Sequence, residues 1–319
     1  MKKFLLFALS LLLTFCAAGC SAGGEQDIRP QVVTTVFPQY DLVRTIAGDT
    51  VDLILLLPPG AESHGYEPTP KNMAAVTECD LFIEIGGPSE HWAAHLRQAA
   101  DKDTDAPRIL TLMTLDGITL LNTEETGHDH NHDHGEDHLH THDHETDEHI
   151  WLSPRNMMLM TEAICRELCA LLPENTELYR ANADAYLEEL SVLDARLTEI
   201  TAGAARRTLI FGDRFPFRYL TYDYGLTAYA AYPGCAAEGE PAPATVADLI
   251  ERMKNEQIPA VFTIEFSRGE VADTIAAETG AKRLELHSCH NLSPADFSAG
   301  VTYLDLMYRN ADALAEALN

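Results

Sequence analysis

Histidine is concentrated in one stretch of the chain that could bind metal ions. Nine of the fourteen histidines lie between His128 and His149, among eight carboxylates, in the run HDHNHDHGEDHLHTHDHETDEH. Such a composition cannot build a packed core. Because ordering a solvated segment around each ion costs entropy, the run is expected to bind several ions weakly and exchange them quickly. This pattern indicates capture or sensing of a metal; the alternative is a charged insertion without a function.

Three motifs place a histidine just beyond a predicted strand. They are LPPGAESHGYEPTP with His64, DEHIWLSP with His149 and LELHSCHNLS with His290. A single histidine is more often a hydrogen-bonded structural residue than a ligand. Imidazole binds Zn²⁺ well, however, and a tetrahedral zinc site needs three or four such donors from separate loops. The three histidines together are therefore candidate metal ligands.

The elements that must position these residues form two series of alternating strands and helices. Continuous apolar runs at 32–36, 51–57, 81–85 and 109–113 predict buried strands, with helices at 39–47, 71–77 and 90–100. A second series has strands at 209–211, 227–231, 260–266 and 283–286 and helices at 243–254, 270–279 and 294–318. This alternation predicts an α/β fold of two lobes with parallel sheets, and a ligand site where the carboxyl ends of both sets of strands face each other.

The middle of the chain is helical. Pro154 suits the first turn of a helix that runs to residue 172, where Pro173 stops it. The next helix, from about 175 to 203, has no internal Gly or Pro, and at 1.5 Å per residue it would reach about 40 Å. We interpret it as one long rigid connector between the lobes; the alternative is an ordinary surface helix.

Charge and the first residues indicate the compartment. Twenty-two Lys and Arg against fifty Asp and Glu give a net charge of −28, which argues against nucleic acid as a partner and attracts cations. Lys2 and Lys3 precede an apolar run at 4–15 that is typical of a signal peptide. The following Ala-Ala-Gly-Cys sequence resembles a bacterial lipobox, which would make Cys20 the lipidated first residue of the mature protein. The alternative is a secreted protein with an incidental cysteine.

These signals divide the chain into five segments. Residues 1–19 are the signal peptide and 20–30 a lipid-anchored tether, so the protein is expected outside the cytoplasm and anchored to the cell membrane. The first lobe spans 31–173 and carries the histidine-rich loop at 127–148. The connecting helix spans 174–204, and the second lobe spans 205–319.

The histidine motifs resemble those of the metal-specific solute-binding proteins of ABC transporters, and the zinc-uptake branch fits best. HGYEPTP, GGPSEHW and EHIWLSP carry the resemblance, which covers nearly the whole mature chain. It implies that His64, in H-x-x-E-P, and His149, in D-x-H-I-W-x-x-P, are metal ligands. It further implies two α/β lobes joined by a long helix with the metal between them, and a histidine-rich loop beside the cleft that marks zinc over manganese.

The chain departs from the family pattern in the second lobe. Where many members open an H-D-A-F-x-Y helix with a third ligand histidine, this chain has FGDRFPFRYL, with Gly212, Asp213 and Arg214 and no histidine. Where an Asp often follows near the C-terminus, His290 is the natural substitute. Four carboxylates compete for the remaining position: Asp213, Glu238, Glu240 and Glu265. Arg214 would disfavour a cation unless a carboxylate such as Glu240 paired with it.

Cys235 and Cys289 both flank the expected site. They could form a disulfide, bind the metal as two thiolates, or be two unrelated buried thiols. The oxidising exterior favours the disulfide. Cys165 and Cys169, four residues apart on a predicted helix, share a face but are poorly placed to bond each other.

The function expected from these observations is a zinc receptor that delivers Zn²⁺ to an ABC permease and its ATPase, as a monomer. A receptor for manganese or another divalent metal is the alternative within the family, and a zinc-dependent surface enzyme or adhesin is the alternative outside it. HETDEH has one residue too many for the H-E-x-x-H motif of zinc hydrolases, and there is no G-x-S-x-G element. We therefore expect no enzyme.

Overall fold

Four apolar runs on each side of a long central helix form two parallel β-sheets. The computed structural model describes residues 29–100, 106–123, 146–232, 234–235 and 239–319. The signal peptide, Cys20, most of the tether, residues 127–145 of the histidine-rich loop and Glu238 lie outside these ranges. No helix within them is long and apolar enough to cross a membrane.

The two sheets have the same topology. The first consists of β1 (Gln31–Thr34), β2 (Asp52–Leu55), β3 (Leu81–Glu84) and β4 (Arg108–Thr111), in the spatial order β2-β1-β3-β4. The second consists of β5 (Thr208–Phe211), β6 (Thr227–Ala230), β7 (Ala260–Thr263) and β8 (Lys282–Glu285), in the order β6-β5-β7-β8. All neighbouring strands are parallel. The α/β fold and the eight predicted strands are confirmed.

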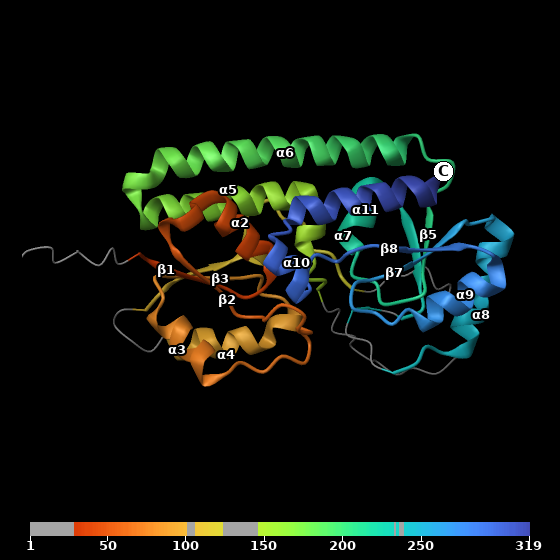
Figure 1. Ribbon diagram of the computed structural model, residues 1–319, viewed down its shortest axis with the longest axis horizontal. Coiled ribbons are helices and arrows are strands. Elements are labelled where there is room, and N and C mark those ends of the chain that lie inside the picture. Colours follow the sequence, from red (N-terminus) through yellow and green to blue (C-terminus); the bar gives the residue numbers. More distant parts are fainter. Residues whose placement is uncertain (1–28, 101–105, 124–145, 233, 236–238) are drawn as a thin grey trace, which may run out of the picture.

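Helices cover both faces of each sheet (Figure 1). The first lobe contains α2 (Phe37–Ala47), α3 (Pro70–Glu78), α4 (His91–Ala100) and α5 (Pro154–Leu171), and the second contains α7 (Arg218–Tyr224), α8 (Pro243–Glu256) and α9 (Glu270–Thr279). Near the C-terminus lie α10 (Pro294–Ala299) and α11 (Tyr303–Leu318). The single helix predicted at 294–318 was wrong, because Gly300 adopts a φ of 74° and breaks it. The short α7 was not predicted.

The connector is one unbroken helix, α6 (Thr176–Ala202), as expected. Its buried residues recur every three or four positions, which places them on one face: Tyr179, Ala183, Tyr186, Leu190, Leu193, Leu197 and Thr201. That face packs against α2 and α5 of the first lobe and against α11, and Figure 1 shows α6 running along both lobes. The helix therefore ties the two sheets into one body.

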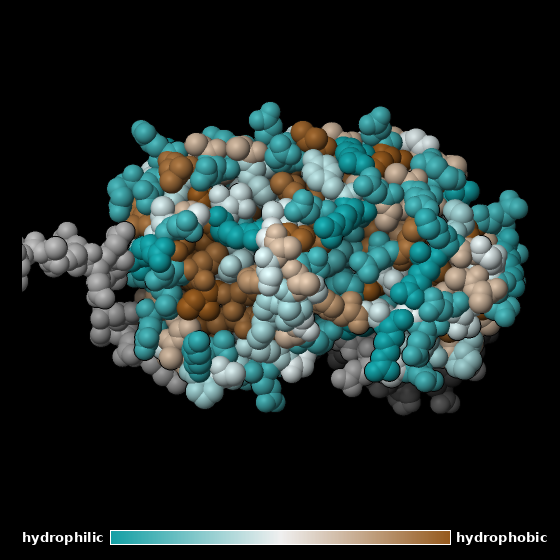
Figure 2. All heavy atoms as spheres, viewed as in Figure 1, coloured by the Kyte–Doolittle hydropathy of each residue, from teal (hydrophilic) through white to brown (hydrophobic). Residues whose placement is uncertain are grey.

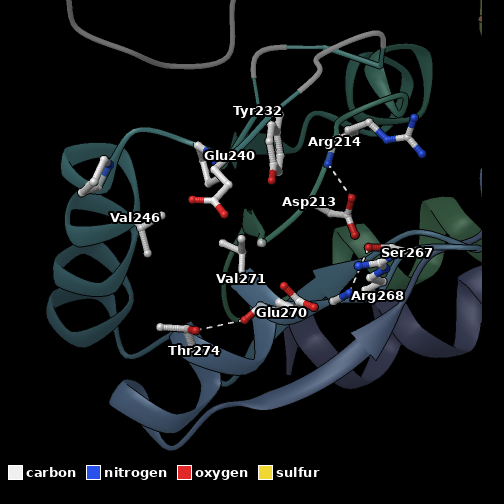
Figure 3. A pocket seen from close by; sticks show the side chains of 15 residues that line it. Asp213, Arg214, Tyr232, Glu240, Val246, Ser267, Arg268, Glu270, Val271 and Thr274 are labelled. Carbon is white, nitrogen blue, oxygen red and sulfur yellow. Dashed lines mark hydrogen bonds between the residues drawn. The ribbon is translucent and has the colours of Figure 1, made fainter.

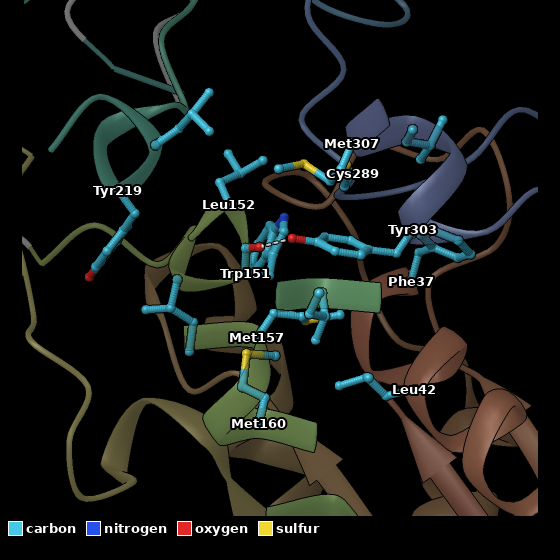
Figure 4. Packing of buried hydrophobic residues seen from close by; sticks show 14 of the residues in the cluster. Phe37, Leu42, Trp151, Leu152, Met157, Met160, Tyr219, Cys289, Tyr303 and Met307 are labelled. Carbon is cyan, nitrogen blue, oxygen red and sulfur yellow. Dashed lines mark hydrogen bonds between the residues drawn. The ribbon is translucent and has the colours of Figure 1, made fainter. Parts of the chain in front are cut away.

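One apolar core extends through both lobes. It joins residues of both sheets and of α5, α6 and α11, and Figure 4 shows its centre around Trp151, Tyr303 and Met157. Tyr303 donates its hydroxyl to the carbonyl of Trp151 at 2.6 Å, so even the polar atom at this point is paired. On the face shown in Figure 2, polar side chains dominate, and a group of apolar side chains surrounds the edge strand β2.

Candidate functional site

Three histidine rings lie close together between the carboxyl ends of the two sheets. His64 lies in the loop after β2, His149 directly precedes the helical turn Ile150–Leu152, and His290 lies in the loop after β8. The ring centroids of His149 and His290 are 5.7 Å apart, and the Trp151 ring is 5.1 Å from each. Burial, His149 and His64 together hold the pKa of His290 well below its usual value, so this ring is neutral at neutral pH.

Each of the three rings carries a buried nitrogen that has no hydrogen-bond partner among the residues that the structure describes. Nδ1 of His149 lies 3.0 Å from Asp147 Oδ1, which also accepts the backbone N–H of His149 at 2.9 Å. This contact fixes the ring, and in the neutral form it keeps the proton on Nδ1, so that loss of the second proton leaves the lone pair of Nε2 for a metal. Nε2 of His64, His149 and His290 is buried in each case, without a hydrogen-bond partner among the described residues. Since buried polar atoms are almost always paired, these three nitrogens are suited to bind a common ligand.

Cys235 supplies a fourth donor at the same place. It follows β6, and together with His290 it lines a small cavity. Burial alone would lower the pKa of His149, but Asp147 and then Cys235 raise it well above its usual value. Burial alone would also lower the pKa of His64, but the interaction with Cys235 outweighs burial, so this pKa is raised. In return, the two imidazoles lower the pKa of the Cys235 thiol although burial opposes this.

These donors form a loose cluster, not a closed coordination sphere. Within residues 29–100, 106–123, 146–232, 234–235 and 239–319, no three His, Cys, Asp or Glu side chains have the spacing of a preformed metal site. The donors come from four separate loops. An ion bound by all four donors would therefore connect four separate loops.

The loop that carries His290 is hydrogen-bonded to the first lobe. The N–H of Phe37, at the start of α2, donates to the His290 carbonyl at 3.3 Å. The side chain of Asn291 donates to the carbonyls of Pro58 and Ala61 at 2.7 and 2.9 Å. His290 thus follows the last strand of the second sheet, as expected, but its backbone is fixed to the lobe that holds the other two histidines.

The carboxylates proposed from the sequence have other contacts. Glu265 accepts both the N–H and the hydroxyl of Ser288, which holds the loop of His290 in place. Asp213 accepts the N–H groups of Arg214 and Ile264 at 2.9 and 3.4 Å. Asp213 and Glu240 both line a separate cavity of about 630 Å³ in the second lobe, shown in Figure 3.

The position of the missing third histidine is sterically closed. A Cβ atom on Gly212 would lie 2.5 Å from the Cα of Ala272 in α9, closer than real contacts allow. Arg214, two residues on, pairs with Glu62 of the first lobe at 3.2 Å, and not with Glu240 as the sequence suggested. Glu62 therefore neutralises the guanidinium of Arg214. Their ion pair joins the two lobes beside the small cavity that Cys235 and His290 line.

The predicted disulfide between Cys235 and Cys289 is wrong, because both thiols are free. Cys289 is fully buried in the core, near Leu152 and Met307 in Figure 4, while Cys235 faces the histidines. Cys165 and Cys169 are also free, with their sulfurs 4.0 Å apart, as their spacing on α5 predicted. The sequence signal for Cys235 was its position just after a predicted strand, the same signal that identified the histidines.

Known proteins resemble this chain over nearly its whole length. The high-affinity zinc uptake system protein ZnuA of Bacillus subtilis is 32% identical over 317 residues, which cover 99% of this chain and 96% of that protein. The zinc-binding lipoprotein AdcA of Streptococcus pneumoniae is 33% identical over 319 residues, and there the chain spans 61% of the relative's length.

Solved structures agree with these relatives. The Zn(II)-bound ZnuA-like domain of Streptococcus pneumoniae AdcA has a TM-score of 0.72 and 30% identity, and the match covers 91% of this chain and 99% of that domain. The family model described as zinc-uptake complex component A, periplasmic, matches residues 32–317. The chain therefore belongs to the family of periplasmic zinc-uptake complex component A.

Proposed function

We propose that this protein is an extracytoplasmic receptor that binds Zn²⁺ through His64, His149 and His290 and delivers it to an ABC permease. The observation that carries the proposal is the group of three buried Nε2 atoms between the sheets that have no hydrogen-bond partner in the described part of the chain. Neutral imidazole nitrogens are donors that zinc accepts readily, and a fully ligated ion in a cleft fits transport better than catalysis, which needs an open position for water.

The anchoring and the partner are part of the same proposal. Cys20 would carry the lipid that holds the protein at the outer side of the cell membrane, and the protein would act as a monomer beside the permease and its ATPase. Release would follow when the permease stabilises a more open arrangement of the lobes, because a partner shifts a conformational equilibrium only by binding one state better.

Titration of the purified protein with Zn²⁺ tests the proposal. One tight site is expected, with weaker sites from the histidine-rich loop, and the exposed His95 on α4 gives a matched control, since His95→Ala should keep the tight site. Excess Mn²⁺ should compete poorly, because Mn²⁺ prefers oxygen ligands. Absence of a tight site, or ready displacement of zinc by Mn²⁺, would refute this assignment.

A further inference from the structure

Among the described residues of the second lobe, Cys235 is a free thiol that lies at the histidine cluster. His64 and His149 belong to the first lobe by sequence, and the loop of His290 is hydrogen-bonded to that lobe. A further bond strengthens this attachment: the indole N–H of Trp151 donates to the carbonyl of Ser288 at 2.8 Å. All three imidazoles are therefore held by the first lobe, while Cys235 lies in the loop after β6 of the second lobe.

The other side chains of the second lobe that could serve are accounted for within the described residues. Glu265 is bonded to Ser288, and Asp213 is bonded to backbone N–H groups. Nδ1 of the buried His287 accepts the N–H of Cys289 at 2.9 Å and lies 3.9 Å from Glu265. Glu240 is exposed and lines the separate cavity of Figure 3. Packing against Ala272 leaves no room for a side chain at Gly212. Cys235 is the candidate that remains.

The three histidines give an independent indication that a ligand binds beside Cys235. His149 and His290 are 2% and 7% exposed, so their unpartnered Nε2 atoms cannot turn to bulk water. The Cys235 thiol interacts with the rings of His64 and His149, and Cys235 lines a small cavity together with His290. An ion bound by these nitrogens would therefore lie near that thiol.

We propose that the thiolate of Cys235 is the metal ligand contributed by the second lobe, which gives a site of three imidazoles and one sulfur. This inference rests on the proposed function. On binding, the S–H bond breaks, the sulfur keeps the electron pair and donates it to Zn²⁺, and the proton passes to solvent. Three nitrogens and one thiolate satisfy tetrahedral zinc, and the soft sulfur further disfavours Mn²⁺.

Cobalt substitution tests the ligand directly, because Co²⁺ bound to thiolate has a sulfur-to-metal charge-transfer band in the near ultraviolet. The reduced protein with one equivalent of Co²⁺ should show this band. Cys235→Ser should abolish it and weaken Zn²⁺ binding at least about tenfold, measured by chelator competition, since loss of a ligand should match or exceed loss of a supporting contact. Cys169→Ser, the same change on α5 far from the site, should leave both unchanged.

The outcomes separate this inference from the proposed function. If the parent protein binds one Zn²⁺ tightly but its cobalt form lacks the band, or if Cys235→Ser keeps the band, Cys235 is not a ligand and the receptor assignment stands. If the parent binds no Zn²⁺ tightly, the proposed function itself fails. A circular dichroism spectrum of Cys235→Ser that matches the parent shows that lost affinity does not come from unfolding.

Discussion

At the scale of single residues, His290 is the donor for which family resemblance gives least guidance. Its Nε2 is buried without a hydrogen-bond partner in the described ranges, and burial, His149 and His64 lower the pKa of its ring. Removal of the ring by His290→Ala should therefore lower Zn²⁺ affinity by more than the roughly 10- to 100-fold loss typical of supporting contacts. Chelator competition at neutral pH measures this loss.

Two carboxylate variants provide the comparison. Asp213→Ala and Glu240→Ala should bind Zn²⁺ like the parent, because both side chains line the other cavity. If His290→Ala binds like the parent while one of these variants fails, that carboxylate is the ligand and not His290. Near-ultraviolet circular dichroism confirms that each variant is folded.

Glu90 makes stability depend on pH. It is buried beside Glu148 and Glu84, accepts the Thr35 hydroxyl at 2.5 Å, and burial raises its pKa to about 8. An unfolded glutamate ionises near pH 4.3, so between about pH 4.3 and 8 the unfolded state loses its proton while the folded state keeps it. The contribution of Glu90 to stability should therefore fall as pH rises through this window and stay constant above it.

Glu90→Gln isolates this effect, because glutamine keeps an oxygen that can accept the N–H groups of Ile85 and Gly86 without titrating. The urea midpoint of Glu90→Gln relative to the parent should increase from pH 5 to pH 8. A difference between the two proteins that is constant over this range would show that Glu90 is ionised in the folded state.

The sequence predicted that His64, His149 and His290 would lie together, but for Cys235 it favoured a disulfide, and this thiol is free. Residues directly after buried parallel strands lie at one edge of a sheet, so strand prediction alone places His64 and His290 near that edge. Which way a thiol in the following loop points depends on contacts with distant segments, such as the bond from Arg214 to the Cys235 carbonyl at 3.3 Å. The oxidising compartment permitted a disulfide, but it could not specify which sulfurs meet.

At the scale of elements, the strands were predictable because buried parallel strands are continuous apolar runs. The split of the last predicted helix into α10 and α11 was not predictable. Gly300 is the only break signal within 294–318, and a glycine inside a helical pattern is often tolerated. The left-handed conformation of Gly300 ends α10, whose Phe297 ring lies 5.4 Å from that of Tyr40 in α2. The turn thus lets a segment after the second sheet pack on the first lobe.

The boundary of the histidine-rich loop matters for its deletion. Asp147, inside the predicted loop at 127–148, orients His149, and its carbonyl accepts the Tyr219 hydroxyl at 2.8 Å. Glu148 accepts the N–H of Ser89. Deletion of residues 127–145 should therefore remove the weak Zn²⁺ sites and leave the tight one, as titration calorimetry can show.

A longer deletion serves as the comparison. Removing residues 127–148 also takes away Asp147 and Glu148, so tight binding should weaken as the support of His149 is lost. Equal tight affinity in both deletions would mean that Asp147 does not position the ligand. Loss of the tight site in the shorter deletion would mean that the loop itself holds the ion.

At the scale of the whole molecule, the two sheets resemble separate domains, yet the chain crosses between them more than once. Helix α6 packs along both, and Arg214 pairs with Glu62 across them. The segment after β8 is hydrogen-bonded to the first lobe, and the chain then continues into α11, which packs against α6. The two lobes were predictable from repeated βα units, but the Arg214–Glu62 and Asn291–Pro58 contacts join residues 152 and 233 positions apart, which local patterns do not reveal.

The shared core has a consequence for how the protein denatures. Residues of both sheets, α6 and α11 belong to one apolar cluster, so melting one lobe would expose the buried side chains of the other. Heating the metal-free protein should give a single calorimetric peak whose calorimetric and van 't Hoff enthalpies agree. Two resolved peaks would show that the lobes melt independently. Cooperative melting means that a substitution in either lobe should lower the melting temperature of the entire receptor.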